Sequence, residues 1–395
     1  MQVTIVGQGY VGLPLAIAAS QAGYMVFGLD HDEEKVALLI SGKSIVEDLT
    51  DHVIKESLES KLFLPTTDQT VISRSELVLI CVPTPLSDDH KPDLSLLISA
   101  ITSVGKNLKS GALVIVESTI APGTCRNILL PILLKESGLK LGDVEIAYSP
   151  ERIDPSNKKW GIRNTPKLLA GLTENSTNRA MEFYGKFIDS INICSSLEIA
   201  EAAKLLENSF RFINISFVNE LAIFCQKVEI DINEVVSAAA TKPYGFMSFY
   251  PSIGVGGHCI PVDPLYLANS AKAVGVPSRF IDLADQINKE MPGYFIGRAE
   301  EKIGGLKDKR VLVVGVSYKP NVADIRESPV ESLISGLQQK GAQVSWHDDL
   351  VKVWKGVKSV ALSGDFDLAI LAIPHNYLDL SLLGNVPILN TQGSI

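Results

Sequence analysis

Short apolar runs alternate with amphipathic segments over the first 150 residues. Apolar residues predominate at positions 3–6 and 25–29, and the alanine-rich segment between them repeats its apolar positions at helical spacing. Further strand-like runs lie at 75–85, 112–119 and 144–152. Helical periodicity returns at 94–108. Strands that alternate with helices in this way predict a parallel, doubly wound sheet.

The pattern changes near residue 196. The segment 196–230 has apolar residues at helical spacing and contains neither glycine nor proline. It predicts one helix of about thirty residues or more. A helix of that length spans a core or joins two subunits, and we expect a homodimer formed through this helix.

The opening pattern returns near the C-terminus. RVLVVGVSYKP from 310 repeats the first strand and turn, GAQVSWHDD from 341 repeats the second strand, and FDLAILAIPHN from 366 repeats the run at 75–85. We therefore predict an α/β fold with two Rossmann-like doubly wound domains joined by a long central helix and a helical region. The predicted division is 1–195 for dinucleotide binding, 196–300 for the helical region with dimerisation and catalysis, and 301–395 for the second domain.

The turn after the first strand carries three glycines and predicts a dinucleotide site. Gly7 permits the tight turn, Gly9 lets a pyrophosphate approach the backbone, and Gly12 lets the helix pack closely on the strand. Asp30 ends the second strand, where an acid accepts hydrogen bonds from a ribose diol and repels a 2′-phosphate. The cofactor we expect is NAD. The second domain has only Gly315 at this turn, so we do not expect a second NAD site of the same kind.

Composition limits the other classes of function. The 395 residues carry a net charge of −9 without a basic run, which argues against nucleic acid as a partner. No apolar run is long enough for a membrane span, and the N-terminus has no leader pattern, so we predict a cytoplasmic protein. The five cysteines are odd in number and scattered, which supports neither a disulfide framework nor a metal site.

Cys259 lies in GVGGHCIPVDP, a stretch with an unusually bare backbone. Gly254, Gly256 and Gly257 allow consecutive N–H groups to approach phosphate or sugar oxygens. A buried structural cysteine is the commoner role of a lone thiol. The neighbouring glycines, His258 and Asp263 favour a reactive one.

The motifs taken together resemble the UDP-glucose/GDP-mannose dehydrogenase family over nearly the whole chain. GQGYVGLPLA, CVPTP, ESTIAPGT, SPER, AAKLLENSFRFINI, GVGGHCIPVDP and GVSYKPNVADIRESP occur in the family's order. The resemblance implies a four-electron, NAD-dependent oxidation of the C6 alcohol of a UDP-sugar to a uronic acid. It implies a thiohemiacetal and then a thioester on Cys259, with the UDP moiety bound by the second domain.

The resemblance also assigns roles to residues. The expected catalytic residues are Cys259, Lys204, Asn208, Asp263, Glu151 and Thr119. Lys204 and Asn208 are four apart on the predicted helix and would face a developing oxyanion together. Either Asp263 or Glu151 would activate water, with Thr119 helping to hold it. The expected cofactor contacts are Gly7, Gly9, Tyr10, Val11, Gly12, Asp30, Lys35, Pro83, Thr84, Ser118, Thr119 and Arg326. The expected substrate contacts are Glu151, Arg152, Lys204, Asn208, Phe249, Tyr250, Gly256, Gly257 and Lys319.

The substrate motifs HCIPVDP and TKPYGFMSFYP look most like the branch that acts on UDP-N-acetylglucosamine for surface polysaccharide precursors. UDP-glucose, UDP-N-acetylgalactosamine and UDP-N-acetylmannosamine stay open as alternatives. Two more remote hypotheses are also open. One is a two-electron dehydrogenase of the 3-hydroxyacid type, which has no use for Cys259, and the other is an NAD-binding sensor without turnover.

Overall fold

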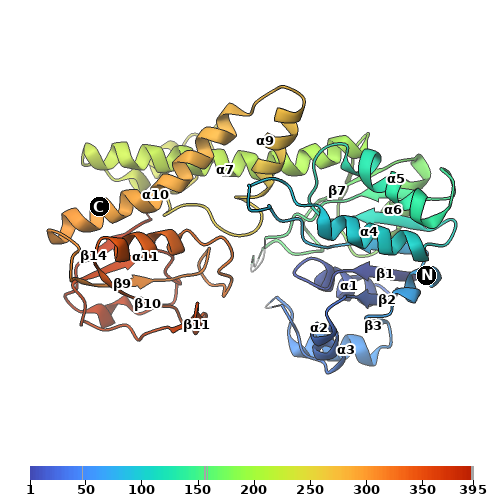
Figure 1. Cartoon of the computed structure of the whole chain (residues 1–395), viewed down its shortest axis with the longest axis horizontal. Coiled ribbons are helices and arrows are strands. Elements are labelled where there is room, and N and C mark those ends of the chain that lie inside the picture. The colour runs from blue at the N-terminus through green and yellow to red at the C-terminus, as the bar shows by residue number, and fades with distance from the viewer. Residues whose placement is uncertain (47, 155–156, 158, 393–395) are drawn as a thin grey trace. The chain divides into compact units, whose positions relative to one another are not determined.

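The computed structural model describes residues 1–46, 48–154, 157 and 159–392 of the chain. It divides into two compact units, Met1–Leu206 and Glu207–Ile395, and the division falls inside one helix. Figure 1 shows an α/β sheet in each of them.

The first unit is built on an eight-stranded sheet with the order β3-β2-β1-β4-β5-β6-β7-β8. Its strands are β1 (Gln2–Val6), β2 (Met25–Leu29), β3 (Phe63–Thr66), β4 (Leu77–Ile80), β5 (Leu113–Val116), β6 (Glu145–Tyr148), β7 (Lys167–Gly171) and β8 (Ile191–Ile193). All neighbouring strands are parallel except β6 and β7. The helices are α1 (Gly12–Gln21), α2 (Glu33–Ile40), α3 (Asp51–Glu59), α4 (Ser95–Asn107), α5 (Leu130–Ser137) and α6 (Glu174–Tyr184). A 3₁₀ turn at Gln69–Arg74 and a π turn at Cys125–Leu129 complete the unit.

Alternate residues of the central strands face two different cores. On β4, Leu77 and Leu79 join the cluster beneath α1 and α6, whereas Val78 and Ile80 join the cluster beneath α4 and α5. A strand that is apolar on both faces is typical of a parallel sheet covered by helices on each side. The sheet is therefore doubly wound, as the sequence predicts.

One long helix, α7 (Leu197–Lys227), has 31 residues and confirms the predicted long helix. It starts after Ser196, whose hydroxyl accepts a hydrogen bond from the backbone N–H of Ile199 at 3.3 Å. A serine at this position satisfies one of the free N–H groups of the first helical turn.

The second unit carries a smaller parallel sheet with the order β10-β9-β13-β14. Its strands are β9 (Arg310–Val314), β10 (Gln343–His347), β13 (Leu368–Leu371) and β14 (Ile388–Asn390), with a separate hairpin of β11 (Val353–Trp354) and β12 (Val357–Lys358). The helices are α8 (Ile232–Ala239), α9 (Asp263–Ala273), α10 (Arg279–Ile303) and α11 (Val330–Gln339), and a 3₁₀ turn spans Leu380–Leu383. Figure 1 shows α10 and α11 on one face of this sheet, and their apolar side chains share a core with it.

The predicted repeat is visible in the hydrogen bonds of the two units. The N–H of Gly7 donates to the carbonyl of Leu29, and the N–H of Gly315 donates to the carbonyl of His347, each at 2.8 Å. The predicted fold class, two Rossmann-like domains with a long helix, is confirmed. The three-part division at residues 195 and 300 stays a prediction. No helix in the described part of the chain is long and apolar enough to cross a membrane.

Candidate active site

The glycine turn between β1 and α1 has the geometry of a phosphate-binding turn. Gly7 has φ 90°, and a Cβ there would lie 2.8 Å from the carbonyl oxygen of Cys81. A Cβ on Gly12 would lie 1.8 Å from the carbonyl oxygen of Gly7, so the helix packs on the turn only with glycine. A Cβ on Gly9 would meet no atom within 4 Å. The backbone at Gly9 is thus open to a ligand, and the residues present fit a dinucleotide.

Asp30 follows β2 and is fixed by the backbone on both carboxylate oxygens. Oδ2 accepts from the N–H of Gln8 at 2.7 Å, and Oδ1 accepts from the N–H of Asp32 at 3.1 Å. The side chain is buried. Tyr10 and Val11 lie in the turn before α1, while Lys35 lies in the first turn of α2 with its ammonium 3.7 Å from Asp32.

The loops after β4 and β5 are tied to each other, and they carry four of the expected cofactor contacts. The hydroxyl of Thr84, next to Pro83, donates to the carbonyl of Thr119 at 2.8 Å. The hydroxyl of Ser118 donates to the carbonyl of Val82 at 2.6 Å. The carboxyl ends of two neighbouring strands therefore present these residues together, where ligands bind in doubly wound sheets.

A buried ion cluster that the sequence did not predict lies beside Glu151. The ammonium of Lys167, at the start of β7, is 2.7 Å from Oε2 of Glu117 and 3.9 Å from Oε2 of Glu151. The hydroxyl of Tyr184 donates to the other oxygen of Glu117. Glu117 and Lys167 are both buried, and one cation is shared by two carboxyl groups.

The pKa of Glu117 reflects that setting. Burial raises it to about 7, and the neighbouring Glu151 adds to the rise against the attraction of Lys167. The pKa of Lys167 is raised, because its two carboxyl partners outweigh its own burial. The cluster therefore takes up or releases a proton near neutral pH while the ammonium stays charged.

Glu151 itself is held by the chain that follows it. Its Oε1 accepts from the N–H groups of Arg152 at 2.6 Å and Ile153 at 2.7 Å, which leaves Oε2 facing Lys167. The guanidinium of Arg152 donates to the carbonyl of Pro166 at 2.6 Å. Glu151, Arg152 and Lys167 line one pocket of the first unit.

Helix α7 carries two buried charged residues in the first unit. Glu201 accepts from the N–H groups of Gly123 at 2.5 Å and Cys125 at 2.9 Å, and so fixes the chain that follows Thr119. Lys204, one turn further on, is 7% exposed. A lysine this shielded is uncommon unless it is paired, which favours a functional over a surface role.

The proposed nucleophile lies in the second unit, in residues 251–262, here called the thiol loop. Nδ1 of His258 is 2.8 Å from Sγ of Cys259. The loop ends in the first turn of α9, where the N–H of Asp263 donates to the carbonyl of Cys259 at 2.9 Å. Asp263 is buried and accepts from the side-chain amide of Asn208 at 2.5 Å. Asn208, Cys259 and Asp263 are thus brought together in this unit.

The glycines of the thiol loop are required by their neighbours. A Cβ on Gly256 would lie 2.6 Å from the carbonyl oxygen of Glu327, and one on Gly257 would lie 2.8 Å from the ring of Tyr318. Gly257 also has φ 85° and donates its N–H to the carbonyl of Arg326 at 3.0 Å. The thiol loop is therefore packed on residues 315–329, here called the β9–α11 loop.

The remaining expected ligand contacts lie around these loops. Phe249 packs edge-on against Phe210 of α7, with ring centroids 5.8 Å apart, and Tyr250 is exposed. Lys319 and Arg326 lie in the β9–α11 loop, where Arg326 pairs with Asp324. Burial alone would raise the pKa of Asp324, but this hydrogen bond lowers it.

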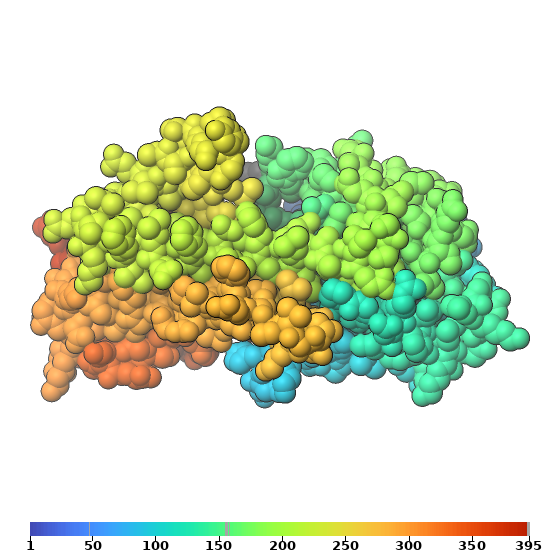
Figure 2. All heavy atoms as spheres, turned by 90° about the horizontal axis from the view of Figure 1, so that it is seen from above, coloured from blue at the N-terminus to red at the C-terminus, as the bar shows by residue number. Residues whose placement is uncertain are grey.

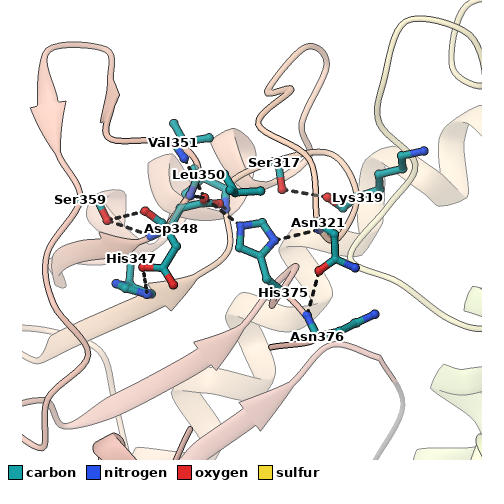
Figure 3. Close-up of polar contacts among 12 residues, drawn as sticks. Ser317, Lys319, Asn321, His347, Asp348, Leu350, Val351, Ser359, His375 and Asn376 are labelled. Atoms are coloured by element: carbon teal, nitrogen blue, oxygen red, sulfur yellow. Dashed lines mark hydrogen bonds and ion pairs between the residues drawn. The ribbon is translucent and has the colours of Figure 1, made fainter. Parts of the chain in front are cut away.

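The second unit repeats the acid at the end of the second strand, with a different environment. Figure 3 shows Asp348 surrounded by donors: the N–H groups of Leu350 and Val351, each at 2.9 Å, and Nε2 of His375, also at 2.9 Å. The N–H of Val316 donates to the other oxygen at 3.0 Å. Burial opposes these bonds, yet they lower the pKa of Asp348 to about 2. Oδ1 of this carboxylate accepts three hydrogen bonds, whereas each oxygen of Asp30 accepts one from a backbone N–H.

The proposed catalytic residues are divided between the units. Thr119, Glu151 and Lys204 belong to the first, and Asn208, Cys259 and Asp263 belong to the second. Their assembly into one site stays a proposal. Among the residues the structure describes, no three His, Cys, Asp or Glu side chains are grouped as metal ligands.

Three family models match the chain in sequence order. They are the NAD binding domain of the UDP-glucose/GDP-mannose dehydrogenase family at residues 1–188, its central domain at 198–290 and its UDP binding domain at 312–379.

Individual relatives match over nearly the full length. A UDP-N-acetyl-D-glucosamine 6-dehydrogenase of Pseudomonas aeruginosa is 33% identical, covering 95% of this chain and 91% of the relative. A UDP-N-acetyl-D-mannosamine dehydrogenase of Pyrococcus horikoshii is also 33% identical, with 92% and 89% covered. The solved structure of a UDP-D-ManNAc dehydrogenase from Pyrococcus horikoshii superposes with a TM-score of 0.91 at 31% identity, over 99% of this chain and 95% of that one. The chain belongs to the UDP-glucose/GDP-mannose dehydrogenase family and is an NAD-dependent oxidoreductase of nucleotide sugars.

Proposed function

We propose that this enzyme oxidises the C6 alcohol of UDP-N-acetylglucosamine to the uronic acid in two successive two-electron steps. The observation that carries the proposal is the thiol loop, in which Cys259 lies 2.8 Å from His258 and directly before the turn that holds Asp263 against Asn208. A two-electron dehydrogenase has no need of a thiol at this point. The relatives' names favour an N-acetylated sugar, with UDP-N-acetylmannosamine as the alternative.

The chemistry balances with the groups of this chain. The first oxidation turns the C6 alcohol into an aldehyde, and the thiolate of Cys259 then forms a C–S bond to C6, giving a thiohemiacetal after protonation of its oxygen. The second oxidation gives a thioester. Water then breaks the C–S bond and leaves a carboxylate and the free thiol. NAD, when bound, accepts the hydride from C6 in each oxidation.

The chain's own residues would hold and shield these species. Gly9 and Asp30 would bind the pyrophosphate and the adenine-side ribose, and Arg326 would add a cation. Lys204 and Asn208 would stabilise the oxyanion at C6. Glu151, with its carboxylate oriented by backbone N–H groups, or Asp263 would take a proton from the attacking water, with Thr119 holding that water. Lys319, Arg152, Phe249, Tyr250, Gly256 and Gly257 would contact the UDP-sugar.

The molar yield of NADH tests the proposal. Limiting UDP-N-acetylglucosamine, UDP-N-acetylmannosamine, UDP-N-acetylgalactosamine and UDP-glucose are each run to completion with excess NAD. We expect two NADH per sugar with UDP-N-acetylglucosamine. One NADH per sugar would refute the thioester route. NAD binding without any absorbance change at 340 nm would support a sensor instead.

A thiol control sharpens the result. Cys259→Ala is expected to abolish formation of the uronic acid, while Cys194→Ala, which removes a thiol outside the proposed site, is expected to keep the wild-type yield. Full turnover by Cys259→Ala would favour the 3-hydroxyacid type of dehydrogenase. We propose that the uronic acid product is a precursor for surface polysaccharide. The cytoplasmic location stays a prediction.

We also infer that two copies of the chain associate through α7. In the second unit this helix exposes Phe210, Phe217 and Phe224, which are 47%, 61% and 57% accessible and recur every seven residues on one side. Figure 2 shows the yellow-green side chains of this part of α7 uncovered at the surface. Sedimentation velocity should give a dimer that Phe217→Glu dissociates and Glu220→Gln, on the same helix, does not. A wild-type monomer at micromolar concentration would contradict the inference.

A further inference from the structure

The tip of the β9–α11 loop is anchored on one buried histidine. The N–H of Asn321 donates to Nδ1 of His375 at 2.9 Å, and the side-chain oxygen of Asn321 accepts from the N–H of Asn376 at 3.1 Å. Figure 3 shows His375 between this loop and Asp348. Asn321 has φ 65°, a conformation that asparagine tolerates better than most residues.

The two contacts of His375 determine its tautomer. A backbone N–H can only donate, so Nδ1 must be the unprotonated acceptor. The carboxylate of Asp348 can only accept, so Nε2 carries the hydrogen. The imidazole is therefore neutral, and its side chain is fully buried, as is that of Asp348. Its ring stacks on Tyr377 at a centroid distance of 5.4 Å.

The loop that His375 anchors is the support of the thiol loop. Between the anchor and the thiol loop, the N–H of Tyr318 donates to the carbonyl of Asp324 at 2.9 Å, which folds the β9–α11 loop back on itself. The ring of Tyr318 then lies under Gly257, and the carbonyl of Arg326 receives the N–H of Gly257. A continuous set of packed contacts thus joins His375 to the residue two positions before Cys259.

We propose that His375 is a positioning residue for the nucleophile: by accepting the N–H of Asn321 it fixes the β9–α11 loop, and through that loop it fixes Cys259 beside His258. The same loop carries Lys319 and Arg326, so one anchor serves both the nucleotide-binding cations and the thiol. Its catalytic meaning rests on the proposed function, whereas the anchoring itself concerns only contacts within the second unit.

Two amide substitutions separate the two bonds of the imidazole. In His375→Asn the amide oxygen can take the place of Nδ1 and accept from Asn321, while the bond to Asp348 is lost. In His375→Gln the amide NH₂ can take the place of Nε2 and donate to Asp348, while the acceptor for Asn321 is lost. If His375 served only to satisfy the buried carboxylate, His375→Asn would be the more damaging change.

The experiment is the rate of Cys259 alkylation by iodoacetamide in the full-length enzyme without substrate. We expect His375→Gln to slow alkylation about tenfold, the equivalent of one net hydrogen bond, and to speed amide exchange in a peptide spanning 317–328. We expect His375→Asn to stay within about twofold of the wild type in both measurements, although it melts at a lower temperature. Equal losses in both variants, or a His375→Gln rate like that of the wild type, would overturn the proposal.

A third variant tests the anchor without changing the buried His375, in case the two His375 variants do not fold. Asn321→Ala leaves His375 and Asp348 untouched, but it disfavours the positive φ at which the N–H of residue 321 meets Nδ1 of His375, and it removes the bond to Asn376. We therefore expect alkylation to slow as in His375→Gln. A normal rate in Asn321→Ala would overturn the proposal. Because alkylation needs no substrate, a failure of the proposed reaction in the wild type remains distinguishable from a failure of the anchor.

Discussion

The side-chain amide of Asn208 donates to Oδ2 of Asp263 at 2.5 Å and so joins α7 to the first turn of α9. Asp263 is buried, and the amide is a hydrogen-bond donor that stabilises its carboxylate there. The bond explains why an amide, and not a second acid, occurs at residue 208.

Replacing Asn208 with Asp would bring two carboxyl groups into contact. One of them would have to hold a proton, so we expect Asn208→Asp to lose about 1–3 kcal/mol of stability at pH 8 and to recover part of it at pH 5. Asn208→Ala removes the donor without adding charge and should show a pH-independent loss. Thermal unfolding at the two pH values measures this, and an Asn208→Asp melting temperature equal to the wild type at pH 8 would contradict it.

The contact between His258 and Cys259 predicts a thiol that reacts at neutral pH. A protonated imidazole 2.8 Å from the sulfur favours the thiolate, the reactive form. We expect His258→Asn to slow alkylation of Cys259 at pH 7 about tenfold and to move the alkylation profile to higher pH. His52→Asn, an exposed histidine of the first unit, is the matched control and should change neither. An unshifted profile in His258→Asn would show that the imidazole does not activate the thiol.

Glu117 predicts an unusual dependence of stability on pH. Burial raises its pKa from the ordinary 4.5 to about 7, so the folded chain holds a proton that the unfolded chain releases. Stability from this group is therefore present below pH 4.5 and is lost as the pH rises through about 7. Urea unfolding from pH 5 to 8 should show stability falling with pH in the wild type, and a flatter profile in Glu117→Gln.

Glu145 provides a control of opposite sign. Burial alone would raise its pKa, but hydrogen bonds from Thr173 and Asn175 lower it. The stability it contributes is present above its ordinary pKa and is lost as the pH falls. Glu145→Gln should therefore leave the slope of stability against pH unchanged between pH 5 and 8.

The outcome that would contradict the Glu117 prediction is an identical slope in the wild type and in Glu117→Gln. It would mean that the Glu117 carboxyl is ionised throughout this pH range.

The parts of the site that were predictable from sequence depend on local backbone geometry. Gly7 and Gly12 are required by atoms a few residues away or on the next strand, and such requirements leave a recurring motif. Lys167 and His375 gave no such signal. Lys167 pairs with Glu117, 50 residues away, and His375 pairs with Asp348, 27 residues away, so their meaning appears only when the sheet brings strand ends together.

The sequence of the second unit likewise predicts only part of its candidate binding turn. The single glycine at its first turn predicts that this unit holds no second NAD site of the same kind, but it does not predict which residue lies near the acid at the end of the second strand. Asp348 and Asp30 occupy equivalent strand ends with similar backbone donors. The difference is His375, which follows β13 where Thr84 follows β4, and a single residue in a loop carries no periodic pattern.

Asp30 is predicted to determine the preference for NAD over NADP. Its carboxylate is aimed by the N–H groups of Gln8 and Asp32, so it offers fixed acceptors to the ribose diol of NAD and repels a 2′-phosphate. We expect Asp30→Ser to raise KM for NAD about tenfold or more, because a charged hydrogen bond is lost, and to improve the relative use of NADP. Asp32→Asn removes a neighbouring charge while keeping an N-cap for α2, and it should change neither KM. Steady-state kinetics with both cofactors measures the ratio, and an Asp30→Ser enzyme that still discriminates fully against NADP would mean that another group excludes the phosphate.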